Sequence, residues 1–256
     1  MPTGAATTEL VHYSVERGIA RIELDSPHNR NALSRQLCSE LAAHLSEASG
    51  DPAVRAIELT HTGSVFCAGA DLSEASSGPS STDAMVTLLR LILEAPKPVV
   101  ARLNGHVRAG GLGLVGAADI VIASRAVTFA FTEVRIGVAP AIITLTTLGR
   151  MTERAAGRYL LTGEKFDAAT AADIGLITAA VDDLDAAAAE LYDQLRLCSP
   201  QGLAETKALT TRATRTAVKD DAAQLAALSA RLFGTAEAQE GMQAFLEKRP
   251  PDWVVG

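Results

Sequence analysis

Cysteine and basic residues are both scarce in this sequence. Only three cysteines, Cys38, Cys67 and Cys198, occur in 256 residues, and none forms a C-x-x-C or C-x-x-H pair. A disulfide scaffold needs more cysteines, so we expect a reducing, cytoplasmic compartment. The 23 basic residues are outnumbered by 30 acidic ones, which gives a net charge of −7. That balance argues against a nucleic-acid-binding surface, which requires an excess of positive charge.

Long apolar runs are also missing. No stretch approaches the roughly 18 consecutive apolar residues that a membrane-spanning helix requires. Residues 1–10 have neither the basic start nor the apolar run of a signal peptide. We therefore expect no membrane association. Apolar side chains nevertheless make up 48% of the chain, which is enough to bury the core of one large domain.

Hydrophobic patterning predicts a mixed α/β fold. Residues 11–16 and 19–24 alternate around Arg17-Gly18 and predict a β-hairpin, and Ser34 is expected to cap the helix that follows. A strand, a strand and a helix then recur at steps of roughly 40 residues, which favours a stacked, coil-like arrangement over a doubly wound sheet. Further strands are expected at 53–60, 99–103, 120–123, 127–131 and 176–181.

The remaining segments read as one loop and many helices. The serine-rich stretch 73–82, with Gly78-Pro79, predicts a mobile surface loop. Residues 83–94 form a strongly apolar helical pattern that is stopped by prolines. Beyond Pro140 the pattern is almost wholly helical, and it ends in alanine-rich amphipathic helices.

Two glycine-containing loops carry the argument for function. Residues 66–72 and 104–111 each follow a predicted strand and end in small residues where a helix begins. Small residues let the backbone approach a ligand closely and leave its N–H groups free. Two such N–H groups aimed at one spot form an oxyanion hole, and the helix that starts near Gly111 adds its positive dipole end. Asp71 would then cap a helix and would not be a catalyst.

The glycine run 111–116 also matches G-x-G-x-x-G, the dinucleotide-binding fingerprint, and Glu133 lies 20 residues after Gly113. The context is poor, because the helix is only about eight residues long. The next strand ends in Ser124-Arg125, with no acid for a ribose. A nicotinamide-dependent oxidoreductase therefore stays a second hypothesis, which tight NADH binding would favour.

Three motifs in order resemble the crotonase (enoyl-CoA hydratase/isomerase) superfamily. They are F-x-A-G-A-D-L at 66–72, N-G-x-x-x-x-G-G at 104–111 followed by A-D-I, and F-x-x-x-E-x-x-x-G-x-x-P at 129–140. Residues 133–140 are also similar to the methylglutaconyl-CoA-hydratase-like branch. The resemblance implies a right-handed spiral of ββα turns over residues 1–198. It also implies a helical region, 199–256, that assembles trimers or dimers of trimers.

The resemblance also implies roles for residues. The ligand would be an acyl-CoA thioester, with coenzyme A arriving as part of the substrate and no metal or other cofactor. The N–H groups of Ala68 and Gly110 would bind the thioester oxygen, and Glu133 would carry a proton. Substrate-binding positions would be Arg30, Ala68, Gly69, Ala70, Asp71, Leu72, Gly110, Gly111, Gly113, Pro140, Phe245 and Lys248, the last two reaching a neighbouring subunit.

One departure affects the predicted reaction. Gly113 stands where two-glutamate hydratases have their other carboxylate, so a water loses an anchor and an acid/base partner. We expect an enoyl-CoA hydratase with the single acid Glu133. Isomerisation, which needs one carboxylate to move a proton between C2 and C4, is the alternative. A third hypothesis is a CoA-ester-binding subunit with little turnover.

Single residues also have simpler interpretations. Glu133 follows a phenylalanine-rich strand, where a carboxylate is either solvated or held in an apolar setting that raises its pKa for general-base work. Cys67 lies in the first loop, but no matched base is visible, which favours a buried, inert thiol. The five histidines have no metal-ligand spacing, which argues against zinc.

Overall fold

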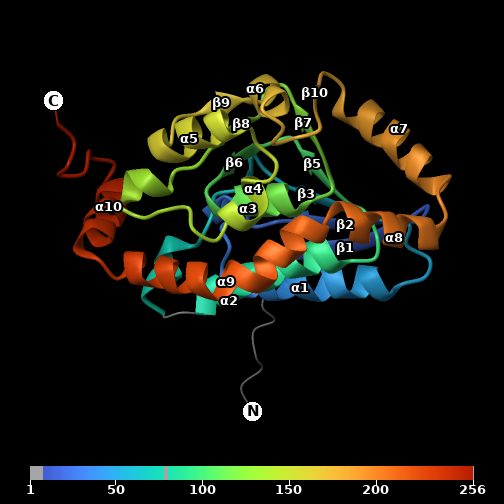
Figure 1. Ribbon diagram of the computed structural model, residues 1–256, viewed down its shortest axis with the longest axis horizontal. Helices are drawn as coiled ribbons and strands as arrows, with labels where there is room; N and C mark the ends of the chain where they lie inside the picture. Colours follow the sequence, from blue (N-terminus) through green and yellow to red (C-terminus); the bar gives the residue numbers. More distant parts are fainter. Residues whose placement is uncertain (1–7, 78–79, 256) are drawn as a thin grey trace, which may run out of the picture.

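The first two elements of the structure form the predicted β-hairpin. The computed structural model describes residues 8–77 and 80–255 (Figure 1). Strands β1 (Val11–Glu16) and β2 (Ile19–Leu24) pair antiparallel. The turn between them uses Arg17 and Gly18, both at positive φ (47° and 79°), which is the backbone that a tight hairpin of right-twisted strands requires.

Two sheets share the remaining strands. The larger has the order β1-β2-β3-β5-β7-β10, in which every pair after the hairpin is parallel. Its further members are β3 (Ala56–His61), β5 (Val99–Leu103), β7 (Ile120–Ser124) and β10 (Ala179–Val181). The smaller has the order β4-β6-β8-β9, with β4 (Val65–Cys67), β6 (His106–Arg108), β8 (Thr128–Ala130) and β9 (Phe166–Asp167).

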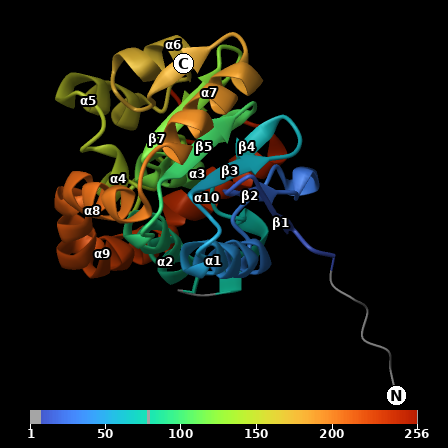
Figure 2. The ribbon, with the colours of Figure 1, turned by 90° about the vertical axis from the view of Figure 1, so that its right-hand side faces the viewer.

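The connections between these sheets confirm the coil-like arrangement. The chain passes from β3 to β4, from β5 to β6 and from β7 to β8, so each turn gives one strand to each sheet. Helices α1 (Arg35–Gly50), α2 (Ser80–Glu94) and α9 (Arg212–Phe233) form a layer below the strands in both views (Figures 1 and 2). Ser34 caps α1 as predicted, its Oγ accepting from the Leu37 N–H at 3.3 Å.

The second half is largely helical, as expected. Helix α3 (Gly110–Ala117) lies at the centre of the molecule. The later helices are α4 (Thr144–Thr147), α5 (Glu153–Thr162), α6 (Ala168–Asp173), α7 (Leu184–Arg196), α8 (Pro200–Thr210) and α10 (Ala236–Glu247). No helix within the described ranges is long and apolar enough to cross a bilayer. The predicted boundary at 198/199 falls between α7 and α8, and the division into two parts stays a prediction.

Three local predictions were wrong. The stretch 73–82 is not a continuous loop, because the 3-10 helix η2 spans Leu72–Ser77 and α2 already begins at Ser80. Residues 78–79 lie outside the described part. The short strands β4, β6 and β9 were missed, because segments of two or three residues are defined only by their pairing. Strand β6 lies inside segment 104–111, and β4 overlaps the start of segment 66–72, both of which were predicted as loops. The strand predicted at 176–181 is too long, because residues 176–178 form the turn before β10.

A buried ion pair ties α8 to the larger sheet. Lys207 is 4% exposed, and its Nζ lies 2.7 Å from Asp119 Oδ2. The same Nζ donates to the carbonyls of Ile92 and Lys97 at 2.7 and 3.0 Å. Asp119 Oδ2 also accepts from the Val99 N–H at 2.8 Å. Removing one member of such a pair leaves the other charge buried without compensation.

Lys207→Ala is therefore expected to lower the free energy of unfolding by about 3 kcal/mol or more. Urea denaturation followed by circular dichroism measures this. Lys219→Ala, at an exposed position of α9, is the matched control and should stay within about 0.5 kcal/mol of the wild type. An unchanged midpoint for Lys207→Ala would show that the pair contributes nothing to stability.

Candidate active site

The three parallel strands of the smaller sheet bring the predicted site residues together. Strand β4 leads into residues 68–71, β6 into residues 109–111, and β8 into residues 131–133. Because the strands are parallel and adjacent, all three segments leave the sheet at one edge. The carboxyl ends of parallel strands are where α/β proteins commonly bind ligands.

Two of these segments touch backbone to backbone. Gly69 has φ +97°, and a Cβ there would lie 2.7 Å from Ala109 Cβ and 3.1 Å from the Gly110 nitrogen. A Cβ at Gly111 would lie 2.8 Å from Cys67 Cβ. Real Cβ atoms essentially never approach that closely, so glycine is required at both positions for the loops to meet.

Gly110 places a backbone amide at the start of α3. It is the first residue of α3, so its N–H has no acceptor within the helix. The preceding Ala109 takes φ 45° and ψ −123°, which is strained for a residue with a side chain. The Ala109 N–H donates to the Ala130 carbonyl at 3.1 Å, which fixes this turn against β8. Such strain commonly marks a functional turn.

The Ala68 amide is not free. Its N–H donates to the Arg30 carbonyl at 3.1 Å, a contact that sequence reasoning missed. Arg30 and the next residue, Asn31, both have left-handed backbone, with φ of 61° and 53°. Fully buried Asn31 holds this bend, because its Nδ2 donates to the carbonyls of Thr62 and Val65 at 3.1 and 2.8 Å. Any ligand that takes the Ala68 N–H has to replace the Arg30 carbonyl.

Glu133 is the buried carboxylate of the site. It begins the 3-10 helix η3 (Glu133–Ile136), is 9% exposed, and follows the fully buried Phe131. Its Oε2 has no hydrogen-bond partner within residues 8–77 and 80–255. Burial raises the pKa of Glu133 to about 7, whereas its own backbone amide lowers the pKa by less. The solvated alternative is therefore wrong, and the apolar setting expected of a general base is present.

The position of the missing second carboxylate is filled by apolar groups. A Cβ at Gly113 would lie 2.5 Å from Met85 Cε and 2.8 Å from Ile143 Cγ2. Met85 is 7% exposed and Ile143 4%. Thr146 Oγ1 donates to the Gly113 carbonyl at 2.9 Å and so holds α4 against α3. A glutamate side chain at this position requires the side chains of Met85 and Ile143 to move aside.

The dinucleotide interpretation of the glycine run fails on the same geometry. Residues 111–116 lie inside α3 and are buried, so they form no exposed phosphate loop. A Cβ at Gly116 would lie 2.8 Å from the Thr146 carbonyl oxygen. These glycines thus let α3 pack closely against β4 and α4.

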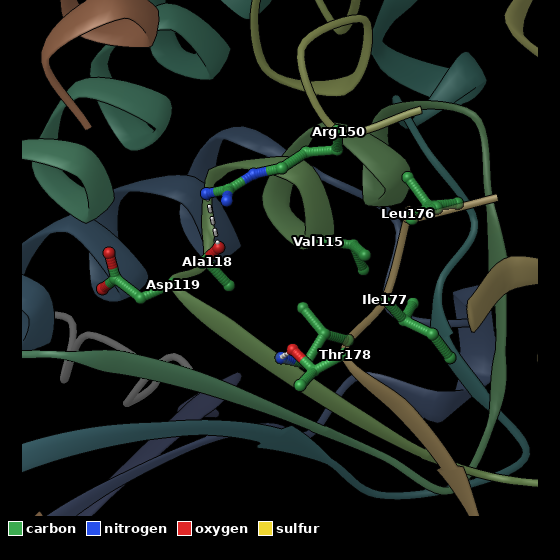
Figure 3. A pocket seen from close by; sticks show the side chains of 9 residues that line it. Val115, Ala118, Asp119, Arg150, Leu176, Ile177 and Thr178 are labelled. Atoms are coloured by element: carbon green, nitrogen blue, oxygen red, sulfur yellow. Dashed lines mark hydrogen bonds between the residues drawn. The ribbon is translucent and has the colours of Figure 1, made fainter. Parts of the chain in front are cut away.

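The opposite end of α3 is also anchored. Arg150 donates from Nε to the Gly116 carbonyl and from Nη2 to the Ala118 carbonyl, both at 3.1 Å. Figure 3 shows this side chain reaching across a cavity of about 100 Å³ that Asp119 and Thr178 also line. A cation at the carboxyl end complements the helix dipole, whose positive end is at Gly110. Arg150, which lines this cavity, thus anchors the carboxyl end of α3. The candidate site lies at the other end of the helix.

The remaining predicted positions fall into two groups. Asp71 caps η2, because its Oδ1 accepts from the Ser73 N–H at 3.0 Å, and Asn29 Nδ2 donates to its Oδ2 at 3.0 Å. Leu72 is half-buried and Pro140 buried in the segment between Glu133 and α4. The other predicted positions are exposed; they are Arg30 and Ala70 near the loops, and Phe245 and Lys248 at the end of α10.

Two other reactive side chains near the loops are held inert. Burial raises the pKa of the Cys67 thiol to about 12, so it stays protonated and is no nucleophile. His106 Nδ1 accepts from the Thr128 N–H at 3.2 Å, which ties the ring to β8. In the described part of the chain, no group of three or more His, Cys, Asp or Glu side chains is placed to hold a metal ion.

The raised pKa of Glu133 predicts a pH-dependent stability. Between pH 4.5 and about 7 the folded chain keeps a proton that the unfolded chain releases, so stability falls as the pH rises. Glu133→Gln removes this cost and is expected to gain up to about 3 kcal/mol over the wild type at pH 8. At pH 4, where both states are protonated, the two proteins should differ little.

Urea denaturation at pH 4 and pH 8 measures both predictions. Exposed Glu190 on α7 provides the control, since Glu190→Gln should track the wild type at both pH values. A Glu133→Gln protein that gains nothing at pH 8 would show that this carboxylate is solvated.

Comparison with known proteins agrees with this geometry. The family model for enoyl-CoA hydratase/isomerase matches residues 14–255. The enoyl-CoA hydratase domain-containing protein 3 of Danio rerio is 33% identical over 92% of this chain and 84% of its own. The 1,2-epoxyphenylacetyl-CoA isomerase of Escherichia coli is 31% identical over 96% of this chain and 98% of its own.

A solved structure is more similar still. The crystal structure of an enoyl-CoA hydratase from Mycobacterium avium is 54% identical, with a TM-score of 0.92, over 97% of this chain and 100% of that one. The expected α/β fold with its helical C-terminal region is thereby confirmed. The chain belongs to the enoyl-CoA hydratase/isomerase family, the crotonase superfamily that its three motifs resemble.

Proposed function

We propose that this chain is an enoyl-CoA hydratase that adds water to the double bond of a 2-enoyl-CoA thioester. Glu133 takes a proton from water as the water oxygen bonds to C3, and the double-bond electrons move to C2 and the thioester oxygen. The resulting enolate is held by backbone N–H groups, and Glu133 returns the same proton to C2. The step is balanced, because it consumes one water and requires no redox partner.

The observation that carries this proposal is the state of Glu133. Its pKa of about 7 means that both protonation states are populated near neutral pH, which a group that accepts and then donates one proton requires. Its Oε2 is buried and has no hydrogen-bond partner within the described residues, which leaves this oxygen without a competing protein contact. A solvated glutamate would be almost fully ionised and a poor proton donor.

Stabilisation of the enolate requires an exchange of acceptors. Gly110 supplies one N–H at the positive end of α3. The Ala68 N–H serves as the second donor once the thioester oxygen replaces the Arg30 carbonyl. An enolate oxygen carries more negative charge than a peptide carbonyl, so the exchange favours the transition state over the ground state.

Binding of the CoA portion is assigned to the exposed basic residues. Arg30 lies in the bend that Asn31 holds beside the first loop, and Lys248 ends α10. In our proposal Arg30 meets a CoA phosphate of its own chain. Lys248 and Phe245 act on a neighbouring subunit of a trimer or a dimer of trimers. The proposed reaction takes place in the cytoplasm and uses no metal or cofactor beyond the coenzyme A of the substrate.

Isomerisation of an unsaturated acyl-CoA is the second candidate. Met85 and Ile143 occupy the space of a second carboxylate at Gly113, so Glu133 stands alone as acid and base. One carboxylate suffices to move a proton between C2 and C4. A similar protein, from Escherichia coli, is named a 1,2-epoxyphenylacetyl-CoA isomerase, so the family includes isomerases of CoA thioesters.

A two-substrate assay separates these reactions. With crotonyl-CoA, hydration removes the conjugated-enoyl absorbance, which is the result we expect. With a 3-enoyl-CoA, isomerisation creates that absorbance. Reaction of the 3-enoyl substrate alone would overturn the hydratase proposal, and silence with both, with CoA esters still bound, would favour a binding subunit.

Glu133→Gln should lower kcat by at least about a thousandfold, because the amide neither accepts nor donates the proton. Its affinity for butyryl-CoA, which lacks the reacting double bond, should stay within about threefold of the wild type, since the shape of the site is kept. Calorimetry measures the affinity. A large loss of affinity would instead assign Glu133 to binding.

A further inference from the structure

Helix α10 lies directly on the turn that carries Glu133. In Figure 1 the red helix α10 meets the segment that follows β8 at one end of the molecule. The contact face of α10 consists of Ala238, Gly241 and Ala244, all buried and spaced by three residues, so they share one side of the helix. Small residues on this face let the helix approach the turn without intervening side chains.

Two glycines make this contact backbone to backbone. Gly137, which ends η3 at φ +76°, would place a Cβ 2.6 Å from the Glu237 carbonyl oxygen. Gly241 would place a Cβ 2.5 Å from the Ile136 carbonyl carbon and 2.6 Å from its oxygen. Neither position has room for even a methyl group, because the neighbouring atoms are main chain and do not rotate away.

The contact reaches Glu133 through the main chain of η3. The N–H groups of Gly137 and Val138 both point to the Glu133 carbonyl, the latter at 3.1 Å. These hydrogen bonds make η3 a rigid turn, so a shift of Ile136 or Gly137 also moves Glu133. On the other side η3 is held by α5, where Arg135 Nε donates to the Thr162 carbonyl at 3.1 Å.

We propose that Gly241 is a positioning residue. It lets α10 pack directly against η3, and this contact fixes the position of the Glu133 carboxylate and keeps water away from it. This rests on the proposed function, in which Glu133 carries the proton. Displacing a reacting group by about 1 Å can cost on the order of a hundredfold in rate, even when the change lies outside the chemistry.

Charge on the neighbouring elements does not account for the state of Glu133. Besides Glu133 itself, the ionisable side chains on η3, α10 and α5 are Arg135, Glu237, Glu240, Glu247, Glu153, Arg154, Arg158 and Tyr159. Burial is the principal cause of the raised pKa of Glu133, and no charged side chain of the described chain contributes to it. A change at Gly241 that admits water should therefore act through desolvation alone.

Gly241→Ala tests the proposal. Carbon-13 NMR of protein labelled at the glutamate carboxyl carbons follows Glu133, whose signal is the one missing from Glu133→Gln. We expect the variant's Glu133 to titrate at least about one pH unit lower than in the wild type, because water reaches it. With crotonyl-CoA, kcat should fall roughly 10- to 100-fold while KM changes less than about threefold.

Gly157→Ala is the matched control. Gly157 lies on α5, and no atom lies within 4 Å of a Cβ placed there, so the same added methyl should leave both readouts at wild-type values. A folded Gly241→Ala protein with unchanged Glu133 titration and unchanged kcat overturns the proposal. If the wild type turns over neither substrate, the proposed function fails, while the titration still decides the role of Gly241.

A second variant covers the case in which Gly241→Ala does not fold. Ala238→Gly removes a fully buried methyl from the same face and needs no extra space. It should loosen α10 and lower the Glu133 titration point in the same direction, by less. Ala227→Gly, at an exposed position of α9, controls for the cost of a helical glycine. Equal titration in both glycine variants and the wild type would also overturn the proposal.

Discussion

The candidate site depends on main chain packed directly against main chain. Gly69 and Gly111 let the loop after β4 meet the start of α3 at distances that exclude a Cβ. The same kind of contact recurs where Gly137 and Gly241 join the Glu133 turn to α10. Contacts of this kind contain no flexible side chain, so they fix amides and a carboxylate with less freedom than side-chain packing would allow.

Two residues of the candidate site lower the stability of the folded chain. Ala109 holds a backbone conformation that suits glycine, and Glu133 is buried with an oxygen that no described group satisfies. Each is unfavourable for a folded chain taken alone. The surrounding core offsets them, because fully buried phenylalanines such as Phe66, Phe129 and Phe131 fill the smaller sheet beside the site.

The proposed chemistry depends on how the two ends and the middle of α3 differ. Its first residue, Gly110, presents an amide at the positive end of the helix, while Arg150 neutralises the carbonyls at the other end. Its middle residue, Gly113, faces Met85 and Ile143 in place of a carboxylate. The site is therefore apolar and positive on the α3 side. Among the described residues Glu133 is the buried acid beside these loops, which suits a mechanism with a single proton carrier.

Sequence patterns alone predict the hairpin, most strands, the cap at Ser34 and the three motifs that identify the family. Periodicity, turn chemistry and local spacing are properties of short segments, and they are readable without the fold. Three contacts became visible only once the chain was folded: the Arg30 carbonyl accepts from the Ala68 amide, Met85 fills the space at Gly113, and α10 packs against the Glu133 turn. Each of these contacts joins residues at least 28 positions apart in the chain. Such contacts depend on how helices and strands pack against one another, which no local sequence pattern encodes.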